Sequence, residues 1–205
     1  MCIADDAISL ASTIKSSFAL DINVLPRQRY YHVGATISDA ILQAGLNYRH
    51  VVEPRVLRLL AQYPKAKTTT GFIKTSAFVG LSKMLDWKDP TKPERILDLA
   101  WLLANQGVES EDDIRQLLMT PGSERLLLEI DGIGPKTVDY LKMLVGLSTV
   151  AVDRHIKSYV NAAGLPYSSY DDIKLLVSMT ADQMGIDHAV LDLAIWKHGA
   201  KDVVR

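Results

Sequence analysis

The amino-acid sequence predicts an all-α protein, and two observations support that prediction. Apolar residues recur at the spacing of one helix face along nearly the whole chain, as in Ile8, Ala11 and Ile14. No stretch alternates apolar and polar residues, as a β-strand would, over more than a few positions. Proline and glycine interrupt the helical pattern repeatedly, so about ten short helices are expected.

The first helix is expected over residues 4–20. Later helices are expected, in chain order, at about 35–46, 51–62, 71–85, 93–106, 110–119, 123–130, 135–145, 154–163, 169–184 and 187–198. Breaks between them fall at Pro64, Pro90, Pro93, Gly107 and Pro121. Proline removes a backbone donor and glycine weakens a helix interior, so both residues favour helix ends.

The composition excludes several classes of protein. Hydrophobic residues make up 48% of the chain and charged residues 23%, with a net charge of −1 and a pI of about 6.5. Nucleic-acid binding therefore has to come from local charge and not from a basic protein. The single cysteine, Cys2, excludes a disulfide or a four-cysteine iron–sulfur cluster within one chain. No basic signal sequence and no long apolar run is present, which predicts a soluble intracellular protein.

Residues 126–155 contain the residues with the clearest chemistry. Gly132, Ile133 and Gly134 form a short turn between two helical patterns, and Lys136 follows almost at once. Glycines allow a tight turn whose backbone N–H groups can hold a phosphate. A lysine in the first turn of a helix lies near the positive end of the helix dipole, which favours its neutral, nucleophilic form. Asp153, at the start of the next helix, is its acid–base or electrostatic partner.

Each of these features also has a purely structural interpretation. The turn could be an ordinary connection between two antiparallel helices, because Gly-x-Gly alone is a weak motif. Lys136 could be a solvated helix residue. Asp153 could serve only as the N-cap of the helix that it precedes.

Taken together, the motifs resemble one family. Residues 128–138 resemble the helix–hairpin–helix element of base-excision DNA glycosylases, whose best-known member type is endonuclease III. Residues 150–156 resemble the loop and catalytic aspartate that follow this element in the same superfamily. Weaker similarity extends to residues 36–44, the first helix of the family's helical barrel, and to residues 191–199, its closing helix.

The resemblance implies specific roles. Lys136 falls at the position of the nucleophile of members that also cleave abasic (AP) sites, and Asp153 falls at the catalytic aspartate. The backbone of Gly132, Ile133 and Gly134 would hold a phosphate. No cofactor and no metal site of side chains are expected, apart from the monovalent cation that family members often recruit at this hairpin. Two departures are evident: Asp131 replaces the usual proline, and the four-cysteine cluster loop is absent.

Further DNA contacts are expected outside the hairpin. Family members insert side chains into DNA from the segment that corresponds here to Asn47, Tyr48, Arg49 and His50, which is otherwise a polar interhelical loop. Arg154 and His155 adjoin Asp153 and are expected to add phosphate contacts. The basic and aromatic segment at residues 27–32 either contacts the DNA backbone or covers the junction between two lobes.

The sequence therefore predicts a two-lobed helical glycosylase with its active site in the cleft between lobes. Residues 33–148 form one lobe, and residues 1–32 with 149–205 form the other.

The expected activity is excision of a damaged base, with AP lyase activity through a lysine Schiff base. Oxidised purine is the first candidate, because lysine-bearing members without the cluster are often 8-oxoguanine glycosylases. A mismatch thymine or uracil glycosylase, a non-enzymatic helix–hairpin–helix DNA-binding protein and an all-α interaction protein are the alternatives. The expected partner is double-stranded DNA with a damaged base, and the protein is expected to be a monomer, cytoplasmic (nucleoid-associated) or nuclear, neither secreted nor in a membrane.

Overall fold

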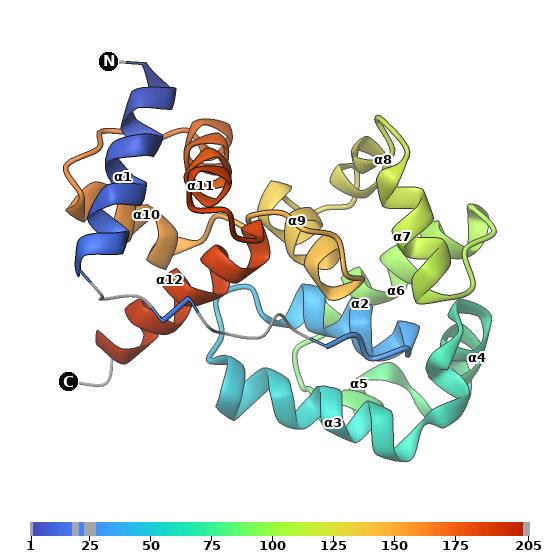
Figure 1. Ribbon diagram of the computed structural model, residues 1–205. Coiled ribbons are helices and arrows are strands. Elements are labelled where there is room, and N and C mark those ends of the chain that lie inside the picture. The colour runs from blue at the N-terminus through green and yellow to red at the C-terminus, as the bar shows by residue number, and fades with distance from the viewer. Residues whose placement is uncertain (1, 18–20, 23–27, 203–205) are drawn as a thin grey trace. The chain divides into compact units, whose positions relative to one another are not determined.

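The computed structural model describes residues 2–17, 21–22 and 28–202, and within these ranges no residue lies in a β-strand. The all-α prediction is therefore confirmed (Figure 1). The helices are α1 (Ile3–Ser17), α2 (Val33–Leu42), α3 (Glu53–Gln62), α4 (Thr69–Val79), α5 (Leu81–Leu85), α6 (Thr91–Asn105), α7 (Glu111–Met119), α8 (Glu124–Leu128), α9 (Pro135–Leu144), α10 (Arg154–Ala162), α11 (Tyr170–Met184) and α12 (His188–Asp202). A π-helical turn, Tyr48–Val52, precedes α3, and a 3₁₀ turn, Pro64–Lys67, precedes α4. The predicted helix end at residues 18–20 and the connector residues 26–27 lie outside the described residues.

The chain divides into two compact units. Unit 1 comprises Met1–Arg27 and Ser148–Arg205, and unit 2 comprises Gln28–Leu147. Unit 1 contains α1 and α10 to α12, whereas α2 to α9 belong to unit 2.

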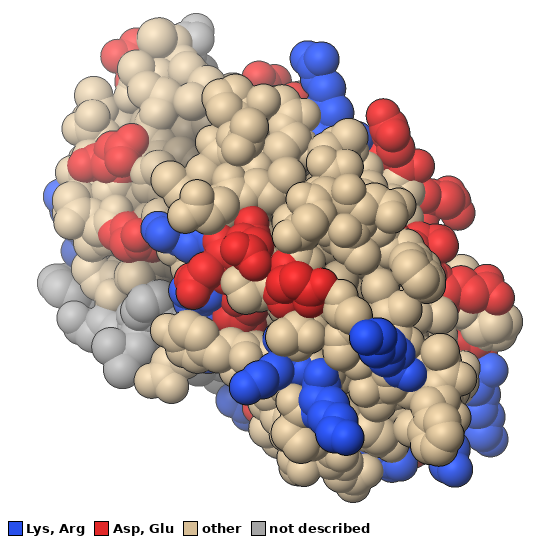
Figure 2. Space-filling view, turned by 90° about the vertical axis from the view of Figure 1, so that its right-hand side faces the viewer, with Lys and Arg blue, Asp and Glu red and all other residues tan. Residues whose placement is uncertain are grey.

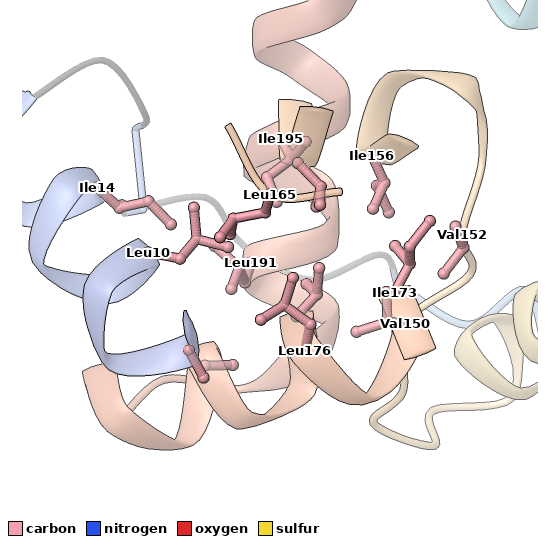
Figure 3. Close-up of a cluster of buried hydrophobic side chains, with 14 of the residues drawn as sticks. Leu10, Ile14, Val150, Val152, Ile156, Leu165, Ile173, Leu176, Leu191 and Ile195 are labelled. Carbon is pink, nitrogen blue, oxygen red and sulfur yellow. The ribbon is translucent and has the colours of Figure 1, made fainter. Parts of the chain in front are cut away.

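The core of unit 1 is formed by apolar side chains of the four helices described for it. Figure 3 shows this cluster, to which α1 contributes Leu10 and Ile14 and α12 contributes Leu191 and Ile195. The loop before α10 belongs to the same core, because Val150 and Val152 are 0% and 3% exposed. These buried residues therefore anchor the loop directly before Asp153.

Unit 2 is organised around α2, which is buried along its whole length. The helix packs against α3, α4, α6 and α9 (Figure 1). Its sequence, VGATISDAIL, has small residues that allow close approach and no charged solvent face. At Gly34, a Cβ atom would lie 2.5 Å from Cδ2 of Phe72 on α4. Glycine is therefore required where these two helices meet.

A buried carboxylate ties the start of α2 to α7. Glu111, 3% exposed, accepts hydrogen bonds from the His32 N–H at 3.1 Å and from the Thr36 hydroxyl. Its second oxygen accepts from Arg29 Nε at 3.2 Å. His32 is the N-cap of α2, and its Nδ1 accepts from the Ala35 N–H at 3.0 Å. Arg29 and His32 thus have structural contacts within unit 2.

Two predicted helices and one predicted loop differ from the structure, each for a local reason. The helix predicted at 71–85 is divided because Gly80 has φ +87°, which ends α4 and starts α5. The helix predicted at 35–46 ends earlier, at Leu42, and Gly45 follows with φ +76°. The polar loop expected at Asn47–His50 is helical from Tyr48, because the Glu53 N–H donates to the Tyr48 carbonyl across a π-helical turn.

We predict that Glu111→Ala lowers the free energy of unfolding by about 3 kcal/mol, because it leaves the buried His32 N–H and Thr36 hydroxyl without their acceptor and removes one carboxylate from the partly buried Arg29. Asp112→Ala is the matched control, since Asp112 pairs with the same Arg29 but its side chain is 70% exposed. That control is expected to cost less than about 1 kcal/mol. Equal losses in urea denaturation would contradict the anchoring role of Glu111.

Candidate active site and nucleic-acid interface

The turn between α8 and α9 is shaped by its two glycines and by the buried side chain between them. Gly132 has φ +77°, a conformation that other residues rarely adopt. Ile133 is 5% exposed, and its N–H donates to the Ile130 carbonyl at 3.0 Å. Gly134 is extended, with φ −106° and ψ 177°, and serves as the N-cap of α9, which begins at Pro135.

The turn leaves two backbone donors open. Neither the Gly132 N–H nor the Gly134 N–H donates a hydrogen bond to any other residue that the structure describes. The Ile133 N–H is used within the turn, so the expected set of three phosphate donors narrows to Gly132 and Gly134. Open N–H groups at a helix N-terminus suit an anion, because the helix dipole is positive there.

Arg95 of α6 lies against this turn and was missed from the sequence. Its Nε donates to the Asp131 carbonyl at 2.5 Å, and its guanidinium is 3.9 Å from the Asp131 carboxylate. A Cβ atom on Gly132 would lie 1.9 Å from an Arg95 nitrogen, so a side chain there would displace the guanidinium from this position. Arg95 therefore places a positive charge beside the negative charge of Asp131 at the hairpin. No local pattern could reveal this contact, which spans 36 positions.

Lys136 is held over the face of α9 that packs on α2. Its Nζ donates to Oε1 of Gln43, the residue that ends α2, and lies 5.8 Å from the centre of the Tyr140 ring. Nε2 of Gln43 is buried and has no hydrogen-bond partner among the described residues. The partly buried lysine is therefore positioned by packing and is not a solvated helix residue.

Tyr140 is in turn held by a buried carboxylate on α2. Asp39 is fully buried and accepts hydrogen bonds from the hydroxyls of Tyr30 at 2.7 Å, Tyr140 at 3.2 Å and Tyr48 at 3.4 Å. Burial and the Asp39 charge raise the pKa of Tyr30 far above its usual value. Tyr30 thus remains a neutral donor to the buried carboxylate, and the Tyr140 hydroxyl donates to its other oxygen.

A second lysine, Lys92, forms hydrogen bonds at the C-terminus of α2. Lys92, at the start of α6, donates from Nζ to the carbonyls of Ile41 at 3.2 Å, Leu42 at 3.1 Å and Ala44 at 2.8 Å. These three acceptors match the three donors of an ammonium group. Burial lowers the pKa of Lys92, and the like charges of Arg95 and Lys136 lower it further.

Asp153 belongs to unit 1 and caps α10. Its Oδ1 accepts from the N–H groups of His155 at 2.8 Å and Ile156 at 3.0 Å. The preceding loop is fixed by a further contact, in which the Ala151 N–H donates to Oδ1 of the buried Asp192 at 2.9 Å. The N-cap role is thus present, and the second oxygen, Oδ2, makes no hydrogen bond with the described residues. Asp192 is a supporting residue that the sequence analysis missed.

The two residues after Asp153 differ in their exposure to solvent. Arg154 is exposed and can reach a phosphate. His155 packs on α12, with its ring edge toward Trp196 at 6.5 Å between centroids. A Cβ atom on Gly199 would lie 2.6 Å from Nδ1 of His155. We therefore expect Arg154, more than His155, to contact a ligand.

The segment predicted to insert into DNA, residues 47–50, likewise contains both exposed and partly buried side chains. Tyr48 points its hydroxyl to Asp39 and Tyr30 and is part of the buried network of unit 2. Asn47 is exposed and caps the π-helical turn, since its Oδ1 accepts from the His50 N–H at 3.1 Å. Arg49 and His50 are exposed. The residues of this segment that are accessible to a ligand are therefore Asn47, Arg49 and His50.

Neither surface charge nor clusters of metal-ligating side chains mark a further binding site among the described residues. Figure 2 shows one face of the molecule, on which acidic and basic side chains are both present and neither sign covers the surface. Within the described ranges, no group of three or more His, Cys, Asp and Glu residues could hold a metal ion. None of the described helices has both the length and the apolar character needed to cross a membrane.

Comparison with known families places nearly the whole chain in one group. The model of DUF8548, a domain of unknown function, matches residues 8–200. The chain belongs to the DUF8548 family. No curated protein matches the sequence. Among solved structures, the chain is similar to the 8-oxoguanine DNA glycosylase of Methanocaldococcus jannaschii, with 16% identity and a TM-score of 0.48, over 95% of this chain and 85% of that one.

We predict that Gly132→Ala lowers the free energy of unfolding by about 2 kcal/mol, because the left-handed conformation is costly and the new Cβ displaces Arg95. Gly134→Ala is the matched control, since nothing lies within 4 Å of its Cβ position and its φ is ordinary. That variant is expected to stay within about 0.5 kcal/mol of the parent protein. If urea denaturation gave equal stabilities for the two variants, the account of the Arg95–Gly132 contact would be wrong.

Proposed function

We propose that this protein is a DNA glycosylase with AP lyase activity, which removes a damaged base through a Schiff base on Lys136. The observation that carries the proposal is the position of the Lys136 amine. Lys136 lies in the first turn of α9, directly after a glycine turn with two backbone N–H groups that are open for a ligand. A phosphate anchor and a candidate nucleophile thus come from one continuous segment, as in the helix–hairpin–helix glycosylases that the sequence resembles.

The anchor would bind the sugar–phosphate backbone without reading sequence. The amides of Gly132 and Gly134 would donate to phosphate oxygens, and Arg95 would add a positive charge beside them. Arg49 and His50 on the π-helical turn, and Arg154 at the start of α10, are exposed and could contact further DNA groups. A bound phosphate next to α9 would bring the sugar of a flipped nucleotide toward Lys136.

The proposed reaction has two stages, displacement of the base by the Lys136 amine and elimination of the 3′ phosphate. The neutral Lys136 amine donates its lone pair to C1′, and the bond from C1′ to the base breaks. The electron pair leaves with the base, which gains a proton, while the amine loses one. Opening of the sugar ring, with a proton delivered to O4′, leaves an iminium. Removal of a proton from C2′ then expels the 3′ phosphate, and water hydrolyses the remaining iminium to an aldehyde and the free lysine amine, which completes the AP lyase step.

Asp153 is proposed to balance the positive charge that develops on the sugar as the base departs. The carboxylate can do this while it caps α10, because only Oδ1 accepts the two helix N–H groups. The same capping favours the second candidate function, a non-enzymatic helix–hairpin–helix DNA-binding protein in which Asp153 has only a structural role. The two functions differ in whether a covalent intermediate with DNA forms.

The resemblance favours an oxidised purine as the substrate base, with 8-oxoguanine as the first candidate. Oxidised pyrimidine and mismatched thymine or uracil are the alternatives within the same chemistry. A panel of duplexes that each carry one lesion identifies the base, and an abasic-site duplex tests the lyase step whichever base is excised.

We predict that Lys136→Gln abolishes borohydride trapping on an abasic-site duplex, because an amide cannot form a Schiff base. Affinity for lesion DNA is expected to stay within about tenfold of the parent protein, since the hairpin is unchanged. Lys83→Gln, which removes an exposed lysine of α5, is the control and is expected to trap normally. Trapping that persists in Lys136→Gln would assign the nucleophile to another amine, and no trapping by the parent protein would favour the non-enzymatic function.

We predict that Asp153→Asn lowers the rate of base removal at least about 10²-fold, about 2.7 kcal/mol of barrier, because a neutral amide cannot balance a cationic sugar. Thermal stability is expected to change little, since an asparagine oxygen also caps a helix. Asp153→Ala is the comparison variant, which loses the cap and is expected to melt earlier. Near-normal turnover in Asp153→Asn would show that capping is the only role of this residue.

A further inference from the structure

Two lysines from different helices meet at the C-terminus of α2. Lys92 of α6 donates to the backbone carbonyls of Ile41, Leu42 and Ala44. Lys136 of α9 donates to the side chain of Gln43, within the same four-residue turn. Both side chains therefore end at the same helix terminus, where backbone carbonyls hold the positive charge of Lys92.

The Lys92 ammonium group is held in place by backbone carbonyls, and no ion pair with a described carboxylate neutralises it. Its three hydrogen bonds all go to backbone carbonyls, and no carboxylate among the described residues forms a salt bridge with it. The side chain is partly buried, so water screens its charge incompletely. Burial is the main factor that lowers the pKa of Lys92, followed by repulsion from Arg95 and then from Lys136. Because electrostatic repulsion is mutual, Lys92 acts on Lys136 as well.

The other charges around Lys136 have partners of their own. On α6, Arg95 is paired with Asp131 beside the hairpin. On α2, the negative charge of Asp39 is shared by three tyrosine hydroxyls, one of them from Tyr140 of α9. On α8, Glu124 is bound to Lys142, which also lies 3.8 Å from the buried Asp139. Lys92 is thus the described cation near Lys136 whose charge no carboxylate compensates.

We propose that Lys92 is a positioning residue that activates Lys136, by fixing a second positive charge at the end of α2 and so favouring the neutral form of the Lys136 amine. This inference rests on the proposed function, since it assigns a purpose to the neutral amine. A nearby cation is an effective way to make a lysine nucleophilic near neutral pH, because the two like charges disfavour simultaneous protonation.

The first experiment titrates Lys136 directly in the free protein. Lysine side chains are methylated with ¹³C-formaldehyde, and the NMR signal of Lys136 is identified by its loss in Lys136→Arg. Lys92→Met is expected to raise the titration midpoint of Lys136 by about one pH unit, because one uncompensated positive charge is removed. Lys92→Arg keeps the charge and is expected to leave the midpoint within about 0.3 units of the parent value. Lys88→Gln removes an exposed charge of the same sign from the segment before α6 and is expected to have no effect.

The second experiment measures the rate of borohydride trapping on an abasic-site duplex against pH. In Lys92→Met, the pH at half-maximal rate is expected to rise with the titration midpoint, and the rate at pH 7 is expected to fall about tenfold. A fall in rate without a shift along the pH axis would mean that Lys92 only caps α2. Equal shifts in Lys92→Arg and Lys92→Met would likewise overturn the electrostatic role.

The two experiments separate this inference from the proposed function. If the parent protein does not trap DNA but the titration midpoint still rises in Lys92→Met, the proposed function fails while the coupling between the lysines stands. If the parent protein traps DNA and the midpoint is unchanged in Lys92→Met, the inference fails while the proposed function stands.

Discussion

The complete burial of α2 is the constraint on which the arrangement of unit 2 depends. Because this helix has no solvent face, other parts of the protein bond two of its polar side chains and its last carbonyls. Thr36 is paired with Glu111, Asp39 with three tyrosines, and the terminal carbonyls with Lys92. Each of these partners comes from a different part of the chain, so the burial of one helix fixes the positions of several others.

The same constraint positions the candidate nucleophile. Asp39 and Gln43 lie four residues apart on α2, and Lys136 and Tyr140 lie four residues apart on α9, so each pair occupies one helix face. Where the two helices pack, Tyr140 bonds to Asp39 and Lys136 bonds to Gln43. The amine that the proposal makes catalytic is therefore oriented by packing between two helices, which is the kind of rigid support that a reacting group needs.

Local patterns in the sequence predicted the elements of the fold and the hairpin, because helix periodicity, capping residues and glycine turns depend on neighbouring residues. The positions of Gly132, Lys136 and Asp153 relative to their helices followed from such patterns. Arg95, Lys92 and Gln43 were missed, because their roles arise only when α6 and α2 approach α9 in space. The π-helical turn and the break at Gly80 were missed for a different reason, since residue type alone does not show which glycine adopts a positive φ or where a helical turn widens.

The central claim is that the Lys136 amine forms the covalent bond to DNA, and mass spectrometry of the trapped complex tests it most directly. The parent protein is reduced with borohydride on an abasic-site duplex, digested with a protease and a nuclease, and the modified peptide is sequenced by fragmentation. The account predicts a single deoxyribose-derived adduct on Lys136. An adduct on another lysine or on the N-terminal amine, or no adduct at all, would contradict it.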